Sequence, residues 1–301
     1  MKQRKAINRK RRNENIMGWT FISPLLIGLA AFLFFPLVFA IIVSFTDYKL
    51  LSGHEFFEFN FKFIGFDNYE AVFNNTAFWG SFYNAIVNAI GVPIGIILAI
   101  FFTNLLIRNP KGSMFFRTLF YLPTVCGAVI ITSIWKIVFT NIGQLIYLNT
   151  GSSANSNLLG EENFMKSMII MGVWSGIGTS ILMLYSAMKG VDKSLYESAE
   201  IDGANGFNQL VHITIPSISP VAFYILLTGI AGSFQEFARF QVMGGYSKTD
   251  YRNMPVWEIY ETVIEKNELG YGSAMAIVLG LILIILSAIQ FGLSRLWVHY
   301  E

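Results

Sequence analysis

Residues 15–46 read NIMGWTFISPLLIGLAAFLFFPLVFAIIVSFT, a stretch without aspartate, glutamate, lysine or arginine. A helix needs about 20 apolar residues to cross the hydrocarbon core of a membrane. Because a charge at the bilayer centre is unfavourable by several kcal/mol, this stretch predicts a membrane-spanning helix. It is too long for a signal-peptide core and has no convincing small-residue cleavage site, so we interpret it as a retained first span.

Five further charge-free windows follow the first one, and the composition agrees with them. The chain is 54% hydrophobic and 13% charged, whereas soluble domains carry about 25% charged residues. The sequence therefore predicts an all-α, polytopic membrane protein in which a tail, residues 1–16, precedes one membrane domain, residues 17–301. Its six transmembrane helices are expected at residues 18–44, 82–107, 117–138, 166–188, 216–236 and 272–294.

The distribution of basic residues predicts the orientation of these helices. An even number of crossings leaves both termini on one side, and that side holds 13 of the 21 Lys and Arg residues, seven of them before residue 13. Cytoplasmic loops are enriched in such residues. Both termini are therefore expected in the cytoplasm. A nucleic-acid-binding patch is the alternative for the basic tail, but the tail directly precedes a span, which favours an orientation signal.

The cytoplasmic loop expected at residues 189–215 has its own helix signals. Ser194 followed by Glu197 is a capping-box pattern, so a short helix should begin near Ser194. The glycines at 203 and 206 should end that helix, Asn205 or Asn208 should cap a second one, and Pro216 suits the start of the fifth span. Two short helices would make a compact protrusion. The local pattern also allows a simpler interpretation, in which these residues only cap helices and make turns.

The segment ESAEIDGA at residues 197–204, followed by Ile213-x-x-Pro216 and by Pro220, resembles the EAA loop of binding-protein-dependent ABC importer permeases. In that family the loop forms a coupling helix that sits in a cleft of the ATPase subunit. The resemblance implies that the coupling residues include Glu197, Ala199, Asp202, Gly203, Ala204 and Pro216. Glycine would allow close approach, and the carboxylates could meet cations or helix N-termini.

Four other stretches are similar to carbohydrate permeases. They are Ser44-Phe45-Thr46 at the end of the first span, FIGFDNY at 63–69, FRTLFYLP at 116–123 and LGYGSA at 269–274. Together they indicate a permease of the type I sugar-uptake class. Within that class, this chain resembles the F subunit of the maltose system. This resemblance extends over nearly the whole chain.

The resemblance also implies a function and an assembly. The chain would be a permease subunit in the bacterial cytoplasmic (plasma) membrane that takes up a carbohydrate, with an oligosaccharide favoured. Its partners would be a second permease subunit in a heterodimer, two ATPase subunits, an extracytoplasmic solute-binding protein and the lipid bilayer, without nucleic acid. No cofactor is expected on this chain, because ATP and Mg would bind to the partner ATPase.

Sugars are recognised by aromatic rings that stack on apolar sugar faces and by amides and hydroxyls that bond sugar hydroxyls. Side chains of these kinds recur at helical spacing along three of the expected spans. The candidates for the substrate path are Asn84, Asn88, Trp174, Thr179, Ser233, Phe234, Gln235, Glu236 and Phe237. The alternative is that their polar groups hold neighbouring helices together.

Motifs of catalysis are missing from the sequence. It contains no G-x-x-x-x-G-K-S/T, no H-E-x-x-H and no G-x-S-x-G, and its three histidines are scattered, so neither an enzyme active site nor a metal site is expected. Ion-coupled carriers usually hold ionisable residues near the centres of their spans, and the expected spans have none. A free-standing secondary carrier or channel stays open as the alternative function, because backbone carbonyls can also coordinate Na⁺.

Overall fold

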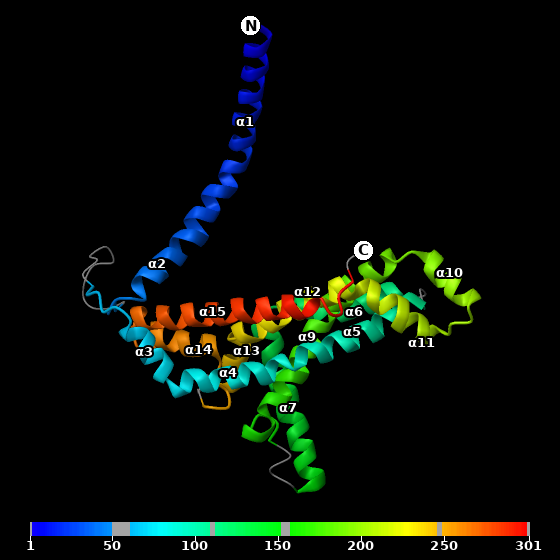
Figure 1. Ribbon diagram of the computed structural model, residues 1–301. Coiled ribbons are helices and arrows are strands. Elements are labelled where there is room, and N and C mark those ends of the chain that lie inside the picture. Colours follow the sequence, from blue (N-terminus) through cyan, green and yellow to red (C-terminus); the bar gives the residue numbers. More distant parts are fainter. Residues whose placement is uncertain (1, 50–60, 109–111, 152–156, 246–248, 300–301) are drawn as a thin grey trace. The chain divides into compact units, whose positions relative to one another are not determined.

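The computed structural model describes residues 2–49, 61–108, 112–151, 157–245 and 249–299 (Figure 1). These residues form helices joined by turns and short loops, with one isolated antiparallel bridge between Thr46 and Phe63. In chain order the helices, with η for π-helical segments, are α1 (Lys2–Leu29), η1 (Ala30–Phe34), α2 (Phe35–Val43), α3 (Asp67–Asn74), α4 (Thr76–Ala89), α5 (Gly91–Arg108), α6 (Ser113–Val125), α7 (Ala128–Thr150), α9 (Glu161–Gly190), α10 (Lys193–Ile201), α11 (Gly206–Gln209), η2 (Leu210–Thr214), α12 (Ile215–Gln235), α13 (Ala238–Gly244), α14 (Pro255–Tyr260), η3 (Glu261–Glu265) and α15 (Leu269–Ser294).

Six helical stretches of the described chain are long and apolar enough to cross a membrane, which confirms the predicted number. They are Asn15–Val43, Thr76–Arg108, Ala128–Thr150, Glu161–Gly190, Gly206–Gln235 and Leu269–Ser294. The first, second, fourth and sixth agree with the predicted ranges to within a few residues. The third and the fifth differ from the prediction, and each difference lies near a proline.

The single helix expected at 117–138 is instead two helices, α6 and α7. Pro123 lies in the last turn of α6, and Cys126 is extended, with φ −79° and ψ 140°. A proline ring removes one helical hydrogen bond and clashes with the carbonyl four residues earlier, which favours a break. The helix then restarts at Ala128 and continues to Thr150, where Gly151 ends it in the left-handed conformation. The loop expected to begin at residue 139 is therefore helical over its first part.

The fifth span begins ten residues earlier than predicted because Pro216 does not start a helix. The helical stretch runs from Gly206, and a π-helical segment, η2, directly precedes the turn that holds Pro216. Another π segment, η1, stands in the same position before Pro36. A π turn widens the helix locally, so it accommodates the ring and the missing N–H of the proline without ending the helix.

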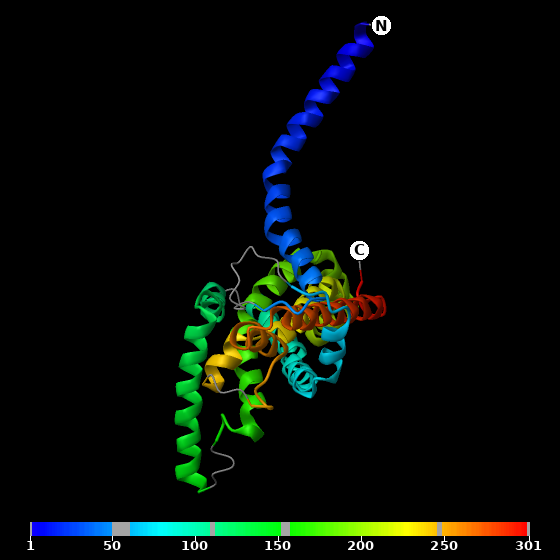
Figure 2. The same ribbon diagram turned by 90° about the vertical axis from the view of Figure 1, so that its left-hand side faces the viewer.

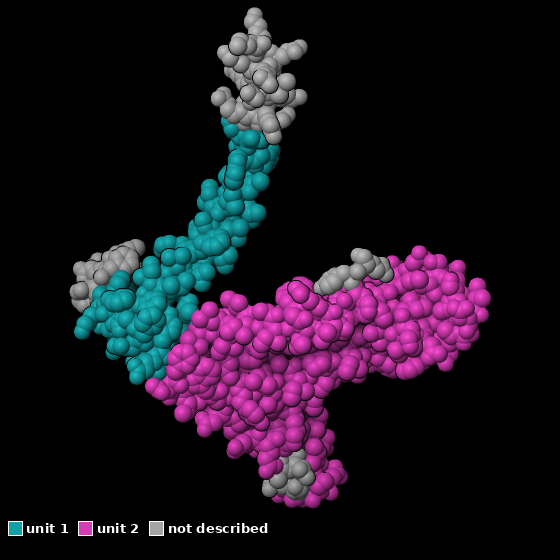
Figure 3. All heavy atoms as spheres, viewed as in Figure 1, with its two compact units in different colours: residues 1–72, 262–277 teal, residues 73–261, 278–301 magenta. Residues whose placement is uncertain are grey.

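The chain divides into two compact units, which Figure 3 shows in different colours. Unit 1 comprises residues 1–72 and 262–277, and unit 2 comprises residues 73–261 and 278–301. In unit 1, three of the stretches that resemble carbohydrate permeases meet. The amide of Asn68 donates to the carbonyls of Ser44 and Thr46 at 2.9 and 2.8 Å, and the backbone N–H of Gly270 donates to Tyr48 at 2.9 Å. These motifs therefore have a structural role, which is to hold the end of the first span against the start of the last.

The core of unit 2 lies between α5, α9 and α12. Its buried side chains are Ala99, Leu106, Ile177, Ile181, Leu184, Met188, Ile218 and Ala222. Lipid tails are as apolar as leucine, so such helices associate through close packing more than through expulsion of water. Small residues allow that packing, since a Cβ on Gly178 would lie 2.7 Å from the carbonyl carbon of Phe120 in α6.

Two further features of unit 2 can be followed in the figures. The later part of α7 projects away from the other helices of the unit in both views (Figures 1 and 2). The short helices α10 and α11 lie together at one end of the unit, next to the end of α5 (Figure 1). Of the two short helices expected within residues 189–215, α10 is therefore present as a separate helix, whereas α11 is continuous with the fifth span.

Candidate functional site

The helix α10 is capped by Asp192, whose side chain accepts a hydrogen bond from the backbone N–H of Ser194 at 3.0 Å. The prediction that Ser194 is the cap was therefore wrong, and the helix begins one residue earlier. The backbone N–H and the hydroxyl of Ser194 both bond the carboxylate of Asp192 and hold its pKa below the ordinary value of 3.8. Aspartate at this position offers a charged acceptor at the positive end of the helix dipole.

The far end of α10 is closed by Gly203, as predicted, whereas Gly206, which was expected to end the same helix, is the first residue of α11. Gly203 has φ +76°, a left-handed conformation that glycine adopts without the steric penalty of a Cβ. The backbone N–H of Ala204 donates to the carbonyl of Ala199 at 2.9 Å, and that of Gly203 donates to Glu200 at 3.0 Å. Asn205 then caps α11 by accepting from Phe207 and Asn208. The loop therefore has a defined shape set by its own sequence.

The surface of this loop is both apolar and acidic. Ile201 and Phe207 are 87% and 71% exposed, and Leu195 is also exposed. Glu197 and Asp202 are exposed beside them. Large apolar side chains that lie outside the predicted spans in this way are typical of a protein-binding surface.

The coupling residues implied by the resemblance fall in two places. Five of them, from Glu197 to Ala204, lie on α10 and the turn that follows it. Pro216 lies in the first turn of α12, after the π segment, and is half-buried.

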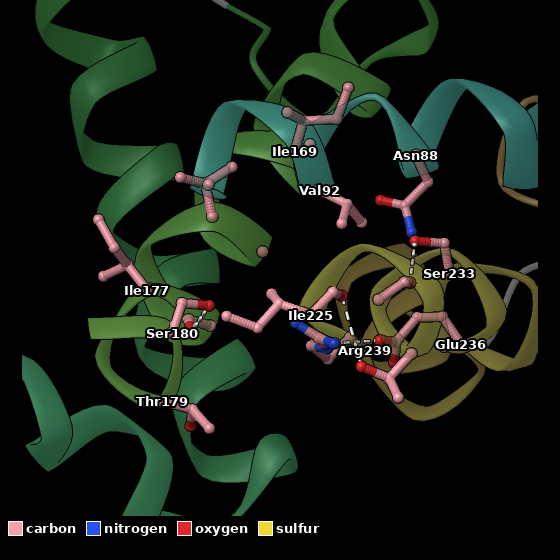
Figure 4. A pocket seen from close by; sticks show the side chains of 18 of the residues that line it. Asn88, Val92, Ile169, Ile177, Thr179, Ser180, Ile225, Ser233, Glu236 and Arg239 are labelled. Atoms are coloured by element: carbon pink, nitrogen blue, oxygen red, sulfur yellow. Dashed lines mark hydrogen bonds and ion pairs between the residues drawn. The ribbon is translucent and has the colours of Figure 1, made fainter. Parts of the chain in front are cut away.

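A cavity of about 600 Å³ lies among α4, α5, α9, α12 and α13 (Figure 4). Five of the side chains predicted for a substrate path line it, namely Asn88, Thr179, Ser233, Gln235 and Glu236. Figure 4 shows the amide of Asn88 pointing toward the hydroxyl of Ser233. The cavity thus brings together an amide, hydroxyls and a carboxylate from three elements that are far apart in the sequence.

The other four predicted path residues do not line this cavity. Asn84 is buried, and its side-chain amide donates to the backbone carbonyls of Asp250 and Asn253 at 2.6 and 2.8 Å. It therefore holds a loop against α4, which was the alternative interpretation. Trp174 packs edge-on against Trp135.

Two aromatic residues near the end of α12 also point elsewhere. Phe234 is 3% exposed and packs against Phe82 in α4, with ring centroids 5.9 Å apart. Phe237 packs against Tyr260, with centroids 4.9 Å apart. Both rings serve helix packing in unit 2.

Arg239 is a cavity residue that sequence reasoning missed. Its guanidinium forms an ion pair with Glu236, one turn earlier, and donates to the hydroxyl of Ser175 at 3.3 Å. The fifth span was predicted to end at residue 236, so Arg239 was not among the candidates for the substrate path. Because α13 folds back against α7, residue 239 lines the cavity instead, so the cavity holds one cation and one anion that neutralise each other.

Glycines form much of the remaining cavity wall. They are Gly91, Gly95, Gly172, Gly176, Gly229 and Gly232. The first two pairs are spaced G-x-x-x-G, a signal of close helix approach in membranes. Here the spacing leaves space instead of a close contact, since a Cβ on Gly95 or Gly176 would meet nothing within 4 Å.

No group of three His, Cys, Asp or Glu side chains that could hold a metal ion occurs in the described residues. Two helices connect the cavity with the α10–α11 loop, because both α5 and α12 line the cavity. The C-terminal end of α5 lies beside α10 and α11, and the N-terminal end of α12 follows α11 and η2 in the chain. The arrangement therefore suits binding and movement of a polar solute.

The sequence matches the family described as "Binding-protein-dependent transport system inner membrane component" over residues 91–298. The chain belongs to this family. Members are inner-membrane components of transport systems, and the six apolar helices agree with a multi-pass protein of the bacterial plasma membrane. The matched region contains the α10–α11 loop and every cavity-lining residue except Asn88.

Two relatives of this inner-membrane component cover nearly its whole length. It is 30% identical to a probable ABC transporter permease protein, YesP, of Bacillus subtilis over 98% of this chain and 95% of that protein. It is 28% identical to the arabinooligosaccharides transport system permease protein AraP of the same organism, over 92% and 88% of the two chains.

A solved structure has the same fold. It is a chain of the bacterial alginate ABC transporter in complex with an alginate pentasaccharide-bound periplasmic protein, with a TM-score of 0.79 over 95% of this chain and 96% of that chain. The sequence identity is 19%, so this likeness supports the fold of an ABC importer permease and not the solute.

Proposed function

We propose that this chain is the transmembrane permease subunit of an ATP-driven importer for a carbohydrate, with an oligosaccharide favoured. It would pair with a second permease subunit and with two ATPase subunits, which carry ATP and Mg. A binding protein outside the cytoplasm would deliver the solute. This chain would conduct the solute and couple its movement to ATP hydrolysis, without covalent chemistry of its own.

The exposed surface of the α10–α11 loop carries this proposal. Ile201 and Phe207 are largely exposed there, and exposed apolar side chains rimmed by charges favour burial against a protein partner. The carboxylates of Glu197 and Asp202 would supply charge-assisted contacts to cations or helix N-termini of the ATPase. Helix α10 ends at Gly203, where the absence of a side chain leaves room for a close backbone approach.

The cavity supports the sugar class of solute. Its volume of about 600 Å³ falls within the range of roughly 300–1,000 Å³ that is usual for small-molecule sites. Asn88, Ser233 and Gln235 offer donors and acceptors of the kind that bond sugar hydroxyls. The named function of the relative AraP agrees with a saccharide.

The orientation follows from the same proposal. An ATPase works in the cytoplasm, so the α10–α11 loop would face it, and both termini would lie on that side. The Lys and Arg residues gather on this side as the positive-inside rule requires. Transport would depend on two states of the permease pair that bind the solute with different affinity, because a ligand shifts an equilibrium only through such a difference.

The proposal is tested with the purified assembly in proteoliposomes that enclose ATP, with the binding protein and a panel of labelled sugars outside. We expect the chain to copurify with a second permease and an ATPase, and to take up a sugar only while ATP is hydrolysed. Uptake by this chain alone, driven by an ion gradient, would instead establish the secondary carrier. Uptake that persists after deletion of the ATPase gene would also contradict the proposal.

A further inference from the structure

The C-terminal residue of α5 contacts the α10–α11 loop directly. The guanidinium of Arg108 donates to the backbone carbonyl of Gly206 at 2.9 Å and to the side-chain oxygen of Asn104 at 3.3 Å. Gly206 follows Arg108 by 98 positions, so this contact ties the loop to a helix that is remote in the sequence. A charged donor makes a stronger hydrogen bond than a neutral one.

The position of Arg108 depends on the absence of a side chain at residue 206. A Cβ on Gly206 would lie 2.5 and 2.6 Å from the two terminal nitrogens of Arg108. Those nitrogens belong to a flexible side chain, so alanine would displace the guanidinium without distorting the backbone. The absence of a side chain at residue 206 thus allows the guanidinium of Arg108 to approach the carbonyl of Gly206.

A second contact ties α10 to the π segment of the fifth span. The hydroxyl of Tyr196 lies 2.9 Å from the hydroxyl of Thr214, which is 5% exposed. Thr214 is the last residue of η2, directly before the turn that holds Pro216. π turns frequently mark functional positions in helices, and this one stands between α10 and the cavity-lining part of α12.

Both contacts lead to helices that line the cavity. Gly91 and Gly95 of α5 form one part of its wall, and Thr228 and Ser233 of α12 form another. Helix α5 is remote from α10 in the sequence, whereas the continuous helix that contains α12 begins at Gly206, shortly after α10. A displacement of α10 can therefore reach the wall through these two side-chain contacts as well as through the backbone.

We propose that Arg108 and Tyr196 are positioning residues that join the α10–α11 loop to α5 and α12, so that displacement of the loop by the ATPase moves the two walls of the cavity together. The inference rests on the proposed function. Neither residue touches the solute, and both act through the helices that they hold.

The test compares sugar uptake per ATP hydrolysed in the reconstituted complex with its binding protein. Arg108→Met removes the donor but keeps a flexible, unbranched apolar stem, and Gly206→Ala displaces the same guanidinium. We expect each to lower the ratio about fivefold or more, the lower limit of usual coupling, while the complex still assembles and hydrolyses ATP. Arg108→Lys should restore much of the ratio, because its ammonium can still donate.

Arg117→Met is the matched control, since this cation packs over the Tyr185 ring at 4.3 Å and does not contact the loop.

Tyr196→Phe and Thr214→Val each remove one hydroxyl of the second contact. Their double variant should lower the ratio no further than the larger single effect, as expected for two partners of one interaction.

The outcomes separate this inference from the function on which it rests. Failure of the unaltered complex to couple uptake to ATP would refute the proposed function. If the unaltered complex couples uptake to ATP hydrolysis, an unchanged ratio of uptake to ATP hydrolysed in Arg108→Met would overturn the role of Arg108. If Arg108→Met fails to assemble, an unchanged ratio in Gly206→Ala would overturn it. An unchanged ratio in Tyr196→Phe would overturn the role of Tyr196, and a loss equal to that of the Arg117→Met control would show a general effect of altering the helix ends.

Discussion

Single residues decide the shape of the α10–α11 loop. Asp192 begins its first helix and Gly203 ends it, and each does so through interactions with its immediate neighbours in the chain. Such local signals are readable from a sequence because they require only a few consecutive residues. They also make the loop sensitive to single substitutions that leave the membrane helices unchanged.

Gly203→Ala should weaken coupling through backbone strain alone. Residue 203 has φ +76°, and nothing lies within 4 Å of a Cβ placed there. The left-handed conformation is unfavourable for alanine by about 1–2 kcal/mol, which lowers the population of the native turn by roughly 5–30-fold. ATP-driven uptake by the reconstituted complex measures the effect. Gly203→Asn is the control, since asparagine tolerates this conformation, and equal losses in both variants would contradict the explanation.

The Asp192 cap predicts a pH effect on α10. Its folded pKa is lowered by the hydrogen bonds from Ser194, so the ionised cap stabilises the helix above the ordinary pKa of aspartate. That contribution is lost as the pH falls through the lowered folded pKa. Amide-exchange protection of α10, corrected for intrinsic rates, should fall in this acidic range. In Asp192→Asn, which keeps a neutral cap, protection should not change there, and a parallel fall would argue against the cap.

At the scale of elements, prolines and glycines set where helices break, widen or approach one another. Pro123 contributes to a break between α6 and α7, whereas Pro216 follows a π turn and leaves its helix continuous. The sequence alone does not distinguish the two outcomes, because they depend on whether neighbouring helices satisfy the freed carbonyls. This explains why the predicted third and fifth helices each had a limit wrong by ten residues or more, while the limits of the other four were correct to within six residues.

Gly178→Ala should destabilise the packing of α6 on α9. The new Cβ would overlap the carbonyl group of Phe120, with its carbon 2.7 Å away, and backbone cannot move aside as a flexible side chain does. Overpacking of this kind is unfavourable by about 1–3 kcal/mol. Thermal unfolding in detergent should show a lower midpoint. Gly176→Ala in the same helix meets nothing within 4 Å and should leave the midpoint unchanged, so similar shifts would contradict this account.

At the scale of the whole molecule, the cavity is assembled from helices that are distant in sequence. Asn88, Thr179 and Ser233 come from three different helices, and their types and helical spacing allowed their prediction. Arg239 was missed because it lies beyond the end of the fifth span and reaches the cavity only after α13 folds back. Asn84 was selected on the same grounds as Asn88, but its amide is used by backbone carbonyls.

Glu236→Gln should impair transport by leaving the Arg239 cation without its anion in the cavity. The side chains of Glu236 and Arg239 are 14% and 29% exposed, so water screens the charge only in part. We expect the unpaired cation to be unfavourable by roughly 1–3 kcal/mol. Binding-protein-dependent uptake of neutral and uronic-acid-containing oligosaccharides measures the effect, with a smaller loss for the acidic sugar. The double variant Glu236→Gln/Arg239→Gln restores neutrality and should recover uptake of the neutral sugar. Failure to recover it would assign the effect to shape and not to charge.

The sequence by itself determined the number of spans, the helical class and the position of the protruding loop. Lipid excludes charges wherever they occur along the chain, and caps and turns act between close neighbours, so both signals are local. Only the tertiary structure decided which polar side chains face the cavity, that Arg239 joins them, and that Arg108 meets Gly206. These contacts depend on how distant helices pack. The type of a residue tells which hydrogen bonds or ion pairs its side chain can form, but not which partner forms them.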